Sequence, residues 1–172
     1  YQYELEPKLA DDSYRKAISL SDGETRILNN YGGFLFEQKR YKEAYAQYLK
    51  ASEDTLYSER SRVFENLGLT ALQLGKREEA KQHFEKALRL NSQRPTSLLQ
   101  MAQLSLEDKN YVAARSYYAG FSQQARQTPQ SLLLGIRLAR VFEDRDQAAS
   151  LGLQLKRLYP GTPEYQQYLS EQ

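Results

Sequence analysis

The sequence contains no cysteine and no tryptophan, and it has a single histidine and a single methionine among its 172 residues. Without cysteine the chain forms no disulfide and offers no thiolate to a metal ion or to a covalent mechanism. The lone histidine, His83, has no second histidine and no cysteine beside it to complete a zinc site or a catalytic pair. We therefore interpret His83 as a surface or boundary residue of a helix, and we expect neither a metal nor a cofactor.

Strong charge of one sign is also absent, as is a hydrophobic run of the roughly 18 residues that a membrane-spanning helix needs. Lysine and arginine number 24 against 22 aspartate and glutamate residues, and the two signs are mixed along the chain. The basic pairs Lys39-Arg40, Lys76-Arg77 and Lys156-Arg157 are typical of solvated helix ends rather than of a phosphate-binding track. We expect no nucleic-acid partner.

Catalytic motifs are equally scarce. The segment from Gly68 to Gly75-Lys76 has six intervening residues where a phosphate-binding loop has four, and no Ser or Thr follows its lysine. Carboxylate pairs such as Asp11-Asp12 and Glu78-Glu79 fall near helix starts or on wet faces, where acidic side chains complement the helix dipole. The sequence therefore predicts no catalytic residue, and we expect a protein that is not an enzyme.

The feature that the sequence does have is an alanine that returns at a nearly constant period. The spacings are 34, 36, 34 and 34 residues. The alanines are Ala10, Ala44, Ala80, Ala114 and Ala148. This period is typical of the tetratricopeptide repeat (TPR), a unit of two helices that stacks into a solenoid.

Two kinds of companion residue keep the same phase as the alanine. An aromatic residue follows four positions later in four repeats, and a small residue precedes it by twelve positions in three. The aromatic residues are Tyr14, Tyr48, Phe84 and Tyr118, and the small ones are Gly32, Gly68 and Ala102. Two packed helices need small residues where their backbones approach and large ones where the gap must be filled. The pattern therefore predicts paired helices in contact through these positions.

The phase predicts a single all-α TPR domain over residues 1–172, a solenoid of antiparallel helix pairs that forms a right-handed superhelix without strands. It begins with a partial repeat at 1–24. Four full repeats follow at 25–58, 61–94, 95–128 and 129–162, and a capping helix closes the chain at 163–172. Prolines mark helix starts, because a proline in the first turn loses no hydrogen bond. Pro95 and Pro129 are expected to open first helices, and Pro7 is expected near the start of the partial repeat's second helix.

Both ends of the predicted solenoid need a cover for their apolar faces. At the C-terminal end Tyr165, Tyr168 and Leu169 have helical spacing and are expected to lie on the last full repeat. At the N-terminal end we expect apolar residues to stay partly uncovered, because the phase places Tyr1 in the middle of a helix. Those residues are Tyr1, Tyr3, Leu5, Leu9 and Tyr14. We expect further repeats before this chain in the natural protein, or self-association through this end.

A partner-binding groove is expected on the first helix of each repeat, which lines the concave side of a TPR solenoid. Apolar groups with a few polar and charged neighbours would suit an extended or helical segment of a protein partner. The groove residues expected in the first two full repeats are Asn29, Gly33, Phe36, Glu65, Leu69 and Leu72. Those expected in the last two are Leu99, Gln103, Leu106, Leu133, Arg137 and Arg140. Each leucine has the alternative of packing on the neighbouring repeat instead.

Several stretches carry a more specific resemblance than the repeat does, because they include linker and turn residues that the fold does not dictate. They are Glu6-Pro7-Lys8-Leu9-Ala10-Asp11, Leu28-Asn29-Asn30-Tyr31-Gly32-Gly33-Phe34-Leu35, Asp54-Thr55-Leu56-Tyr57, Leu134-Gly135-Ile136-Arg137-Leu138-Ala139 and Leu153-Gln154-Leu155-Lys156-Arg157-Leu158-Tyr159-Pro160. Together they resemble the PilF/PilW family of type IV pilus biogenesis lipoproteins over essentially the whole chain.

The resemblance implies a pilotin, a protein held by an N-terminal lipid at the periplasmic face of the outer membrane. Such a protein helps the secretin PilQ reach that membrane and assemble there, so that the pilus (fimbria) used for twitching motility can leave the cell. The signal peptide, the lipidated cysteine and the first repeats of the family pattern are missing from the sequence, so any membrane contact would come through an anchor outside it. A general TPR adaptor for a chaperone or another protein complex remains the alternative.

Overall fold

The structure is a computed structural model that describes residues 2–172, with side chains from Glu6 onward. Over these residues the regular structure is α-helical and contains no strand, as predicted. The helices of residues 1–92 are α1 (Gln2–Ser21), α2 (Thr25–Glu37), α3 (Tyr41–Ser52), α4 (Arg60–Gln73) and α5 (Arg77–Leu90). Those of residues 93–172 are α6 (Pro95–Glu107), α7 (Tyr111–Gln124), α8 (Pro129–Val141), α9 (Arg145–Leu158) and α10 (Pro163–Ser170). The two sets form two compact units, and each is described by itself.

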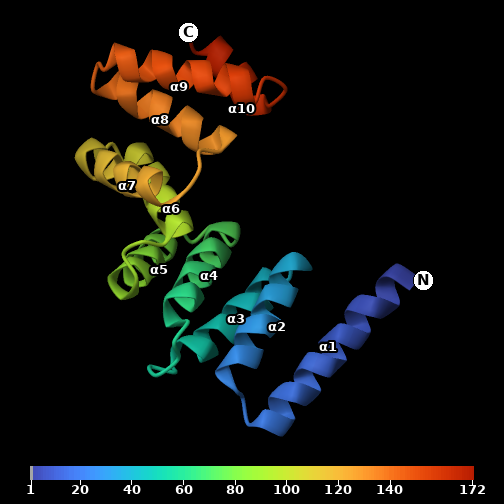
Figure 1. Cartoon of the computed structure of the whole chain (residues 1–172). Coiled ribbons are helices and arrows are strands. Elements are labelled where there is room, and N and C mark those ends of the chain that lie inside the picture. Colours follow the sequence, from blue (N-terminus) through green and yellow to red (C-terminus); the bar gives the residue numbers. More distant parts are fainter. Residues whose placement is uncertain (1) are drawn as a thin grey trace. The chain divides into compact units, whose positions relative to one another are not determined.

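Consecutive helices pair as the repeat period predicts. In unit 1 the pairs are α2 with α3 and α4 with α5, and in unit 2 they are α6 with α7 and α8 with α9 (Figure 1). Each pair falls within one predicted full repeat, except that α4 begins at Arg60, one residue before the predicted bound of 61. The helix pairs are thereby confirmed, while the superhelix and the single domain stay predictions.

The turn inside each helix pair has the same backbone geometry in all four full repeats. One residue of each turn has a positive φ, in the left-handed region that favours glycine. These residues are Lys39 (φ 61°), Gly75 (φ 73°), Lys109 (φ 61°) and Glu143 (φ 57°). They are 36, 34 and 34 residues apart, so the turn keeps the repeat phase although only one member is glycine.

Prolines and hydroxyl caps set the helix starts in unit 2. Pro95, Pro129 and Pro163 each lie in the first turn of their helices, where a missing N–H costs no hydrogen bond. The side chain of Thr128 accepts a hydrogen bond from the amide of Ser131, and the Ser131 hydroxyl accepts one from the amide of Thr128. This capping box fixes the start of α8. Pro95 begins α6 and Pro129 begins α8, as expected.

The core of unit 1 is built on the predicted small-to-aromatic contacts. Ala44 and Ala80 are completely buried, and the ring that follows each of them lies against a glycine of the first helix. A Cβ added to Gly32 would lie 2.5 Å from Cε1 of Tyr48, and one added to Gly68 would lie 2.6 Å from Cε1 of Phe84. These glycines permit α2 to approach α3, and α4 to approach α5, as the sequence predicts.

The core of unit 2 departs from this pattern at the last repeat. The aromatic residue expected four positions after Ala148 is replaced by Gly152, which is buried. The hydroxyl of Tyr168, from α10, lies where a Cβ of Gly152 would be. Tyr165 and Tyr168 pack on the cluster formed by α8 and α9, so α10 lies over the last helix pair. Leu169 stays 44% exposed, so its predicted place in that cover was wrong.

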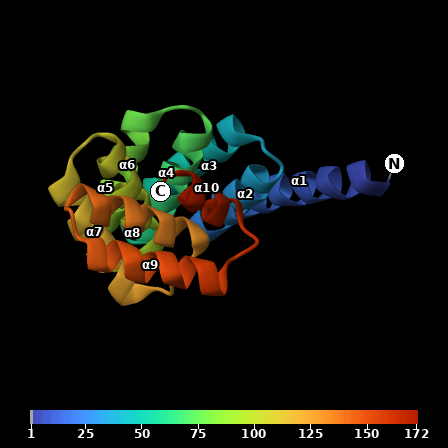
Figure 2. The ribbon, with the colours of Figure 1, turned by 90° about the horizontal axis from the view of Figure 1, so that it is seen from above.

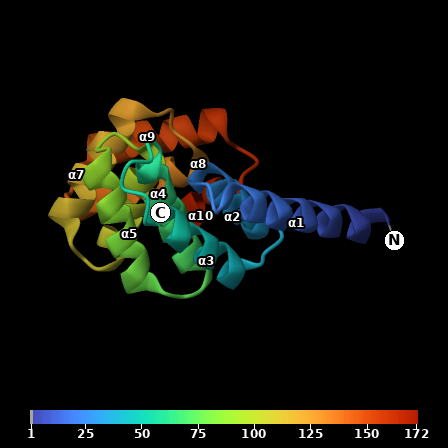
Figure 3. The ribbon, with the colours of Figure 1, turned by 90° about the horizontal axis from the view of Figure 1, so that it is seen from below.

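Helix α1 differs from the prediction. It runs as one helix through Pro7, which the sequence placed near a helix start. Helix-favouring residues such as Glu4, Leu5 and Glu6 precede the proline and offset its single lost hydrogen bond. The N-terminal half of α1 extends beyond the other helices of unit 1 (Figures 2 and 3).

The C-terminal half of α1 holds to α2 through rings and charges. Tyr14 stacks on Tyr31 with ring centroids 5.3 Å apart. Asp11 accepts hydrogen bonds from the Tyr31 hydroxyl and from Arg40, the latter at 3.2 Å. Leu9 is 58% exposed, in agreement with the expected uncovered end. The same expectation for Tyr1, Tyr3 and Leu5 lies outside the described side chains.

Candidate protein-binding surface

Unit 1 contains an open polar cavity of about 410 Å³. Side chains of α1, α2, α3 and α4 line it, and amide and aromatic groups dominate. The lining residues are Tyr14, Asn29, Asn30, Gly33, Phe34, Glu37, Tyr48 and Asn66. Asn29 and Gly33 were predicted as groove residues, so the structure brings two predicted positions to one hollow. Asn30 and Asn66, which line the same cavity, were not predicted as groove residues.

Asparagine side chains give this cavity its hydrogen-bonding character. Nδ2 of Asn66 donates to Oδ1 of Asn29 at 3.2 Å, which links α4 to α2 and orients both amides. Each amide retains donor or acceptor capacity after that bond, and Asn30 beside them is exposed. An array of amides that can both donate and accept suits a peptide backbone, which presents N–H and C=O groups in alternation. The sequence did contain a signal for the unpredicted asparagines. Asn30 and Asn66 are 36 residues apart, as are Ala44 and Ala80, so they occupy the same position in two consecutive repeats.

Apolar groups continue the first-helix surface of unit 1 beyond the cavity. Phe36, Leu69 and Leu72 are half-buried, as expected for residues that offer part of their surface. Phe36 meets Tyr41 edge to face, with ring centroids 5.2 Å apart. Glu65 was predicted to face the groove, but only 7% of it is exposed. This prediction was wrong, because α4 is packed against α2, α3 and α5, and Glu65 is buried within that packing.

In unit 2 the leucines that were predicted for the groove lie in the hydrophobic core or pack against it. Leu99 and Leu106 pack on a buried cluster of Ala102, Ala114, Leu134 and Leu138 while keeping part of their surface exposed. Leu133 is only 5% exposed, so it follows the alternative of packing inside the repeat array rather than facing a groove. It belongs to α8, which packs against α6, α7, α9 and α10. Gln103 stays half-exposed and donates to Glu107 at 2.9 Å.

The two predicted arginines of α8 are held by the capping helix. Nη2 of Arg137 donates to Oε1 of Glu171 at 2.7 Å, and Nη1 of Arg140 lies 3.8 Å from Oε2 of the same carboxylate. The hydrogen bond from Arg137 lowers the pKa of the Glu171 carboxyl below its ordinary value. Arg140 also lies over the ring of Tyr168, 5.6 Å from its centroid. Sequence reasoning missed Glu171, although it lies 34 residues after Arg137.

His83 is half-buried among rings of unit 1, in agreement with its interpretation as a boundary residue. The Tyr45 hydroxyl lies 2.7 Å from Nε2 of His83, and it donates to Oε2 of Glu79 at 3.1 Å. Burial lowers the pKa of His83 below its ordinary value. Among the side chains described from Glu6 to Gln172, no three His, Cys, Asp or Glu residues come together as ligands for a metal ion.

The helices also answer two questions that the sequence raised, one about a phosphate-binding loop and one about a membrane-spanning helix. Gly68 lies inside α4 with the Phe84 ring against it, so the segment up to Lys76 forms no phosphate-binding loop. None of the helices in the described part of the chain combines the length and the apolar character required to cross a bilayer.

Comparison with known proteins agrees with this repeat architecture. Two family models, both described as tetratricopeptide repeat, match residues 24–93 and 66–129. The type IV pilus assembly protein PilF of Pseudomonas aeruginosa is 61% identical over 171 residues, which are 99% of this chain and 68% of that protein.

Solved structures show the same relationship. A structure from the functional characterisation of Pseudomonas aeruginosa PilF matches with a TM-score of 0.94 and 61% identity, over 100% of this chain and 78% of that one. PilW, described as a widely conserved type IV pilus biogenesis factor, matches with a TM-score of 0.77 and 26% identity, over 98% and 78% of the two chains. The TPR protein YrrB, at 18% identity and a TM-score of 0.74 over 98% and 86%, shares the fold.

Proposed function

We propose, from the premise that this chain belongs to the family of the type IV pilus assembly protein PilF, that it binds the pilus secretin PilQ and promotes its assembly in the outer membrane. Membership of this family confirms the predicted TPR scaffold, which is not an enzyme, in pilus biogenesis. The secretin as partner, the pilotin role and the lipid anchor at the periplasmic face of the outer membrane are parts of the proposal.

The observation that carries the proposal is the asparagine-lined cavity of unit 1. Asn29 and Asn66 are oriented by their mutual hydrogen bond of 3.2 Å, and Asn30 adds a third amide at the same hollow. An extended segment of a secretin subunit can bond to these amides through its backbone. Half-buried Phe36 and Leu69 lie on the same first helices and offer apolar contact for its side chains.

The mechanism requires no chemistry at the site. The repeat array captures a segment of the unassembled secretin and keeps it from non-productive contacts. The lipid anchor of the intact protein then brings the complex to the outer membrane, where secretin subunits assemble. Binding through backbone groups also explains how a cavity without any lysine or arginine can hold a protein segment, because main-chain hydrogen bonds supply the affinity.

A deletion strain tests the proposal. We expect heat-stable PilQ multimers to disappear from the outer-membrane fraction when the full-length gene is deleted, and to return when the gene is supplied on a plasmid. A full-length protein with Asn30→Ala and Asn66→Ala should restore them poorly, although it accumulates to the normal level. Multimers that form normally in the outer membrane of the deletion strain would contradict the proposed function.

A further inference from the structure

A second cavity, in unit 2, lies at the turn from α8 to α9 and beside α10. Its volume is about 690 Å³. Arg140, Arg145 and Tyr168 line it together with the small residues Ala148 and Ala149. Of these residues only Arg140 belongs to the first-helix surface predicted from the sequence. The cavity is therefore a separate feature with its own chemistry.

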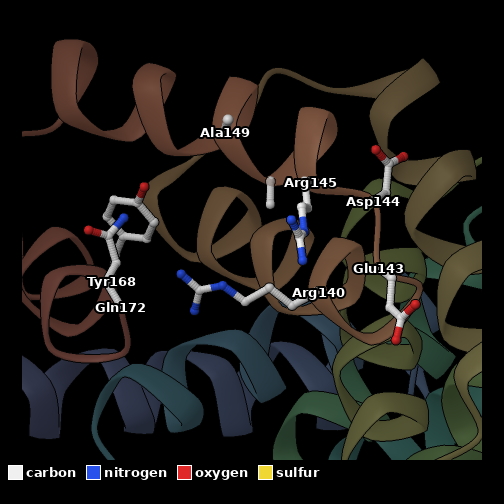
Figure 4. Close-up of a pocket in the computed structure, with 8 residues that line it drawn as sticks. Arg140, Glu143, Asp144, Arg145, Ala149, Tyr168 and Gln172 are labelled. Atoms are coloured by element: carbon white, nitrogen blue, oxygen red, sulfur yellow. The ribbon is translucent and has the colours of Figure 1, made fainter.

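Two guanidinium groups extend into this cavity from different helices. Figure 4 shows Arg140, near the end of α8, and Arg145, at the start of α9, with their side chains directed toward the same space. Arg140 is positioned by the ring of Tyr168 and by Glu171, at 5.6 Å from the centroid and 3.8 Å from Oε2 respectively. The side chain of Arg145 makes no hydrogen bond or ion pair with any residue in the described part of the chain. One positive charge at the cavity is thus left without a partner.

The acidic residues at the cavity do not neutralise Arg145. Asp144 caps α9, where its Oδ1 accepts a hydrogen bond from the amide of Gln147 at 3.0 Å. In Figure 4 Asp144 and Glu143 lie on the side of the cavity opposite Tyr168 and Gln172. The space between the two guanidinium groups is therefore open to an anion. A carboxylate there can accept from both arginines, because guanidinium groups present paired N–H donors.

We propose that this cavity binds a carboxylate side chain in an acidic segment of a protein partner. The inference rests on the proposed function, since it takes the partner to be a protein. Ala148 and Ala149 leave room for a backbone beside the arginines, and the Tyr168 ring lies at the side of the cavity opposite Glu143 and Asp144. An anionic membrane surface is the less suitable occupant. Such a surface needs a broad basic patch, whereas the only basic residues among the described ones that line this cavity are Arg140 and Arg145, and Glu143 and Asp144 lie at its edge.

NMR titration of the purified chain tests the proposal. The probe is a short peptide rich in glutamate and aspartate, acetylated and amidated at its ends, and the matched probe has glutamine and asparagine instead. We expect the acidic peptide to shift the Nε–H resonances of Arg140 and Arg145, and the neutral peptide to shift neither. Arg145→Gln should weaken the acidic peptide at least about ten-fold, because one charge-assisted hydrogen-bonding group is lost. Arg157→Gln is the matched control, since Arg157 is an exposed residue of the same helix outside the cavity.

Three outcomes would overturn the proposal. The first is equal binding of the acidic peptide by the wild type and the Arg145→Gln protein, and the second is equal binding of the two peptides. The third is binding that depends on Arg145 only with vesicles of equal parts phosphatidylglycerol and phosphatidylcholine, which would assign the cavity to lipid. PilQ binding is measured separately with the same proteins. A wild type that binds the acidic peptide but not PilQ supports this cavity and contradicts the proposed function.

Discussion

The ring of Tyr48 in α3 lies directly against the backbone of Gly32 in α2. A Cβ added to Gly32 would come within 2.5 Å of Cε1 of that ring, and Tyr48 is itself only 3% exposed. Neither partner has room to move, because the core around them is close-packed. This contact sets the distance between α2 and α3, and residues of both helices line the asparagine-lined cavity.

Replacing Gly32 by alanine should destabilise unit 1. The added methyl group overlaps a buried ring, and overpacking of this kind costs ~1–3 kcal/mol, which exceeds the helix propensity that alanine contributes. We expect a net loss of about 1 kcal/mol or more in the free energy of unfolding, measured with urea. Gly33→Ala is the control, since its Cβ would meet only the Tyr48 hydroxyl, at 3.7 Å. Equal stability of the two variants would contradict the packing described here.

Removal of the Tyr168 ring should detach the cap of unit 2. Tyr168 covers Gly152 and packs on the cluster that contains Leu151 and Leu155, so Tyr168→Ala leaves that cluster partly exposed. We expect a loss of about 2 kcal/mol and faster hydrogen exchange of amides in α9. Leu169→Ala on the same helix should change stability by less than about 0.5 kcal/mol, because Leu169 is exposed. A greater loss for Leu169→Ala than for Tyr168→Ala would refute this assignment of the cap.

The single histidine makes one pH effect directly observable. Burial lowers the pKa of His83 in the folded chain below the value of about 6.5 that it has when unfolded. The unfolded state therefore takes up the proton first as pH falls, and the folded chain should lose stability below about pH 6.5. Above that pH His83 is neutral in both states, and no stability is lost through it. The titratable groups that face His83 are Tyr45 of α3 and Glu79 of α5.

The His83 effect is checked by urea unfolding at a series of pH values and by NMR titration of its one imidazole resonance. In His83→Gln the stability difference between pH 7 and pH 5 should be smaller than in the wild type. The imidazole of the wild type should titrate below about pH 6.5. A midpoint above that value would show that the neighbouring Glu79 outweighs burial, in contradiction to this prediction.

The amides of the unit 1 cavity should matter for partner binding more than for folding. Asn30→Ala with Asn66→Ala removes two hydrogen-bonding groups from the surface, and we expect PilQ binding to weaken about ten-fold or more in a pull-down with the full-length protein. The lost bond to Asn29 should cost only ~0.5–1.5 kcal/mol of stability. Gln82→Ala, at an exposed position of α5, is the matched control and should bind normally. Unchanged binding by the double variant would remove this cavity from the account.

Sequence periodicity was sufficient to predict the helix pairs and their closest contacts. Ala44, Ala80 and Ala114 are completely buried, and Gly32 and Gly68 receive the rings that the spacing assigns to them. The reason is that these positions depend on a short-range geometry, two adjacent helices joined by a short turn, which repeats in every unit. The same information is present several times in one sequence, so chance matches are averaged out.

Surface availability could not be predicted in the same way, because it depends on which helices cover a face. Leu133 occupies a groove position of the repeat, yet it is buried, since α8 packs against α6, α7, α9 and α10. Arg145 lies outside the groove positions, and it was missed because its importance arises from the open space beside Arg140 and Tyr168. Pro7 was misplaced because a helix tolerates one lost hydrogen bond when no turn is required there.

Site-specific photocrosslinking in living cells tests the central claim most directly, that the first-helix surface of unit 1 binds PilQ. A photoreactive residue is placed in the full-length protein at Asn30 or Phe36 of α2, or at the exposed positions Ala46 and Leu49 of α3. The account predicts crosslinks to PilQ from Asn30 and Phe36 and none from Ala46 and Leu49. Crosslinks to PilQ from the α3 positions alone would contradict it.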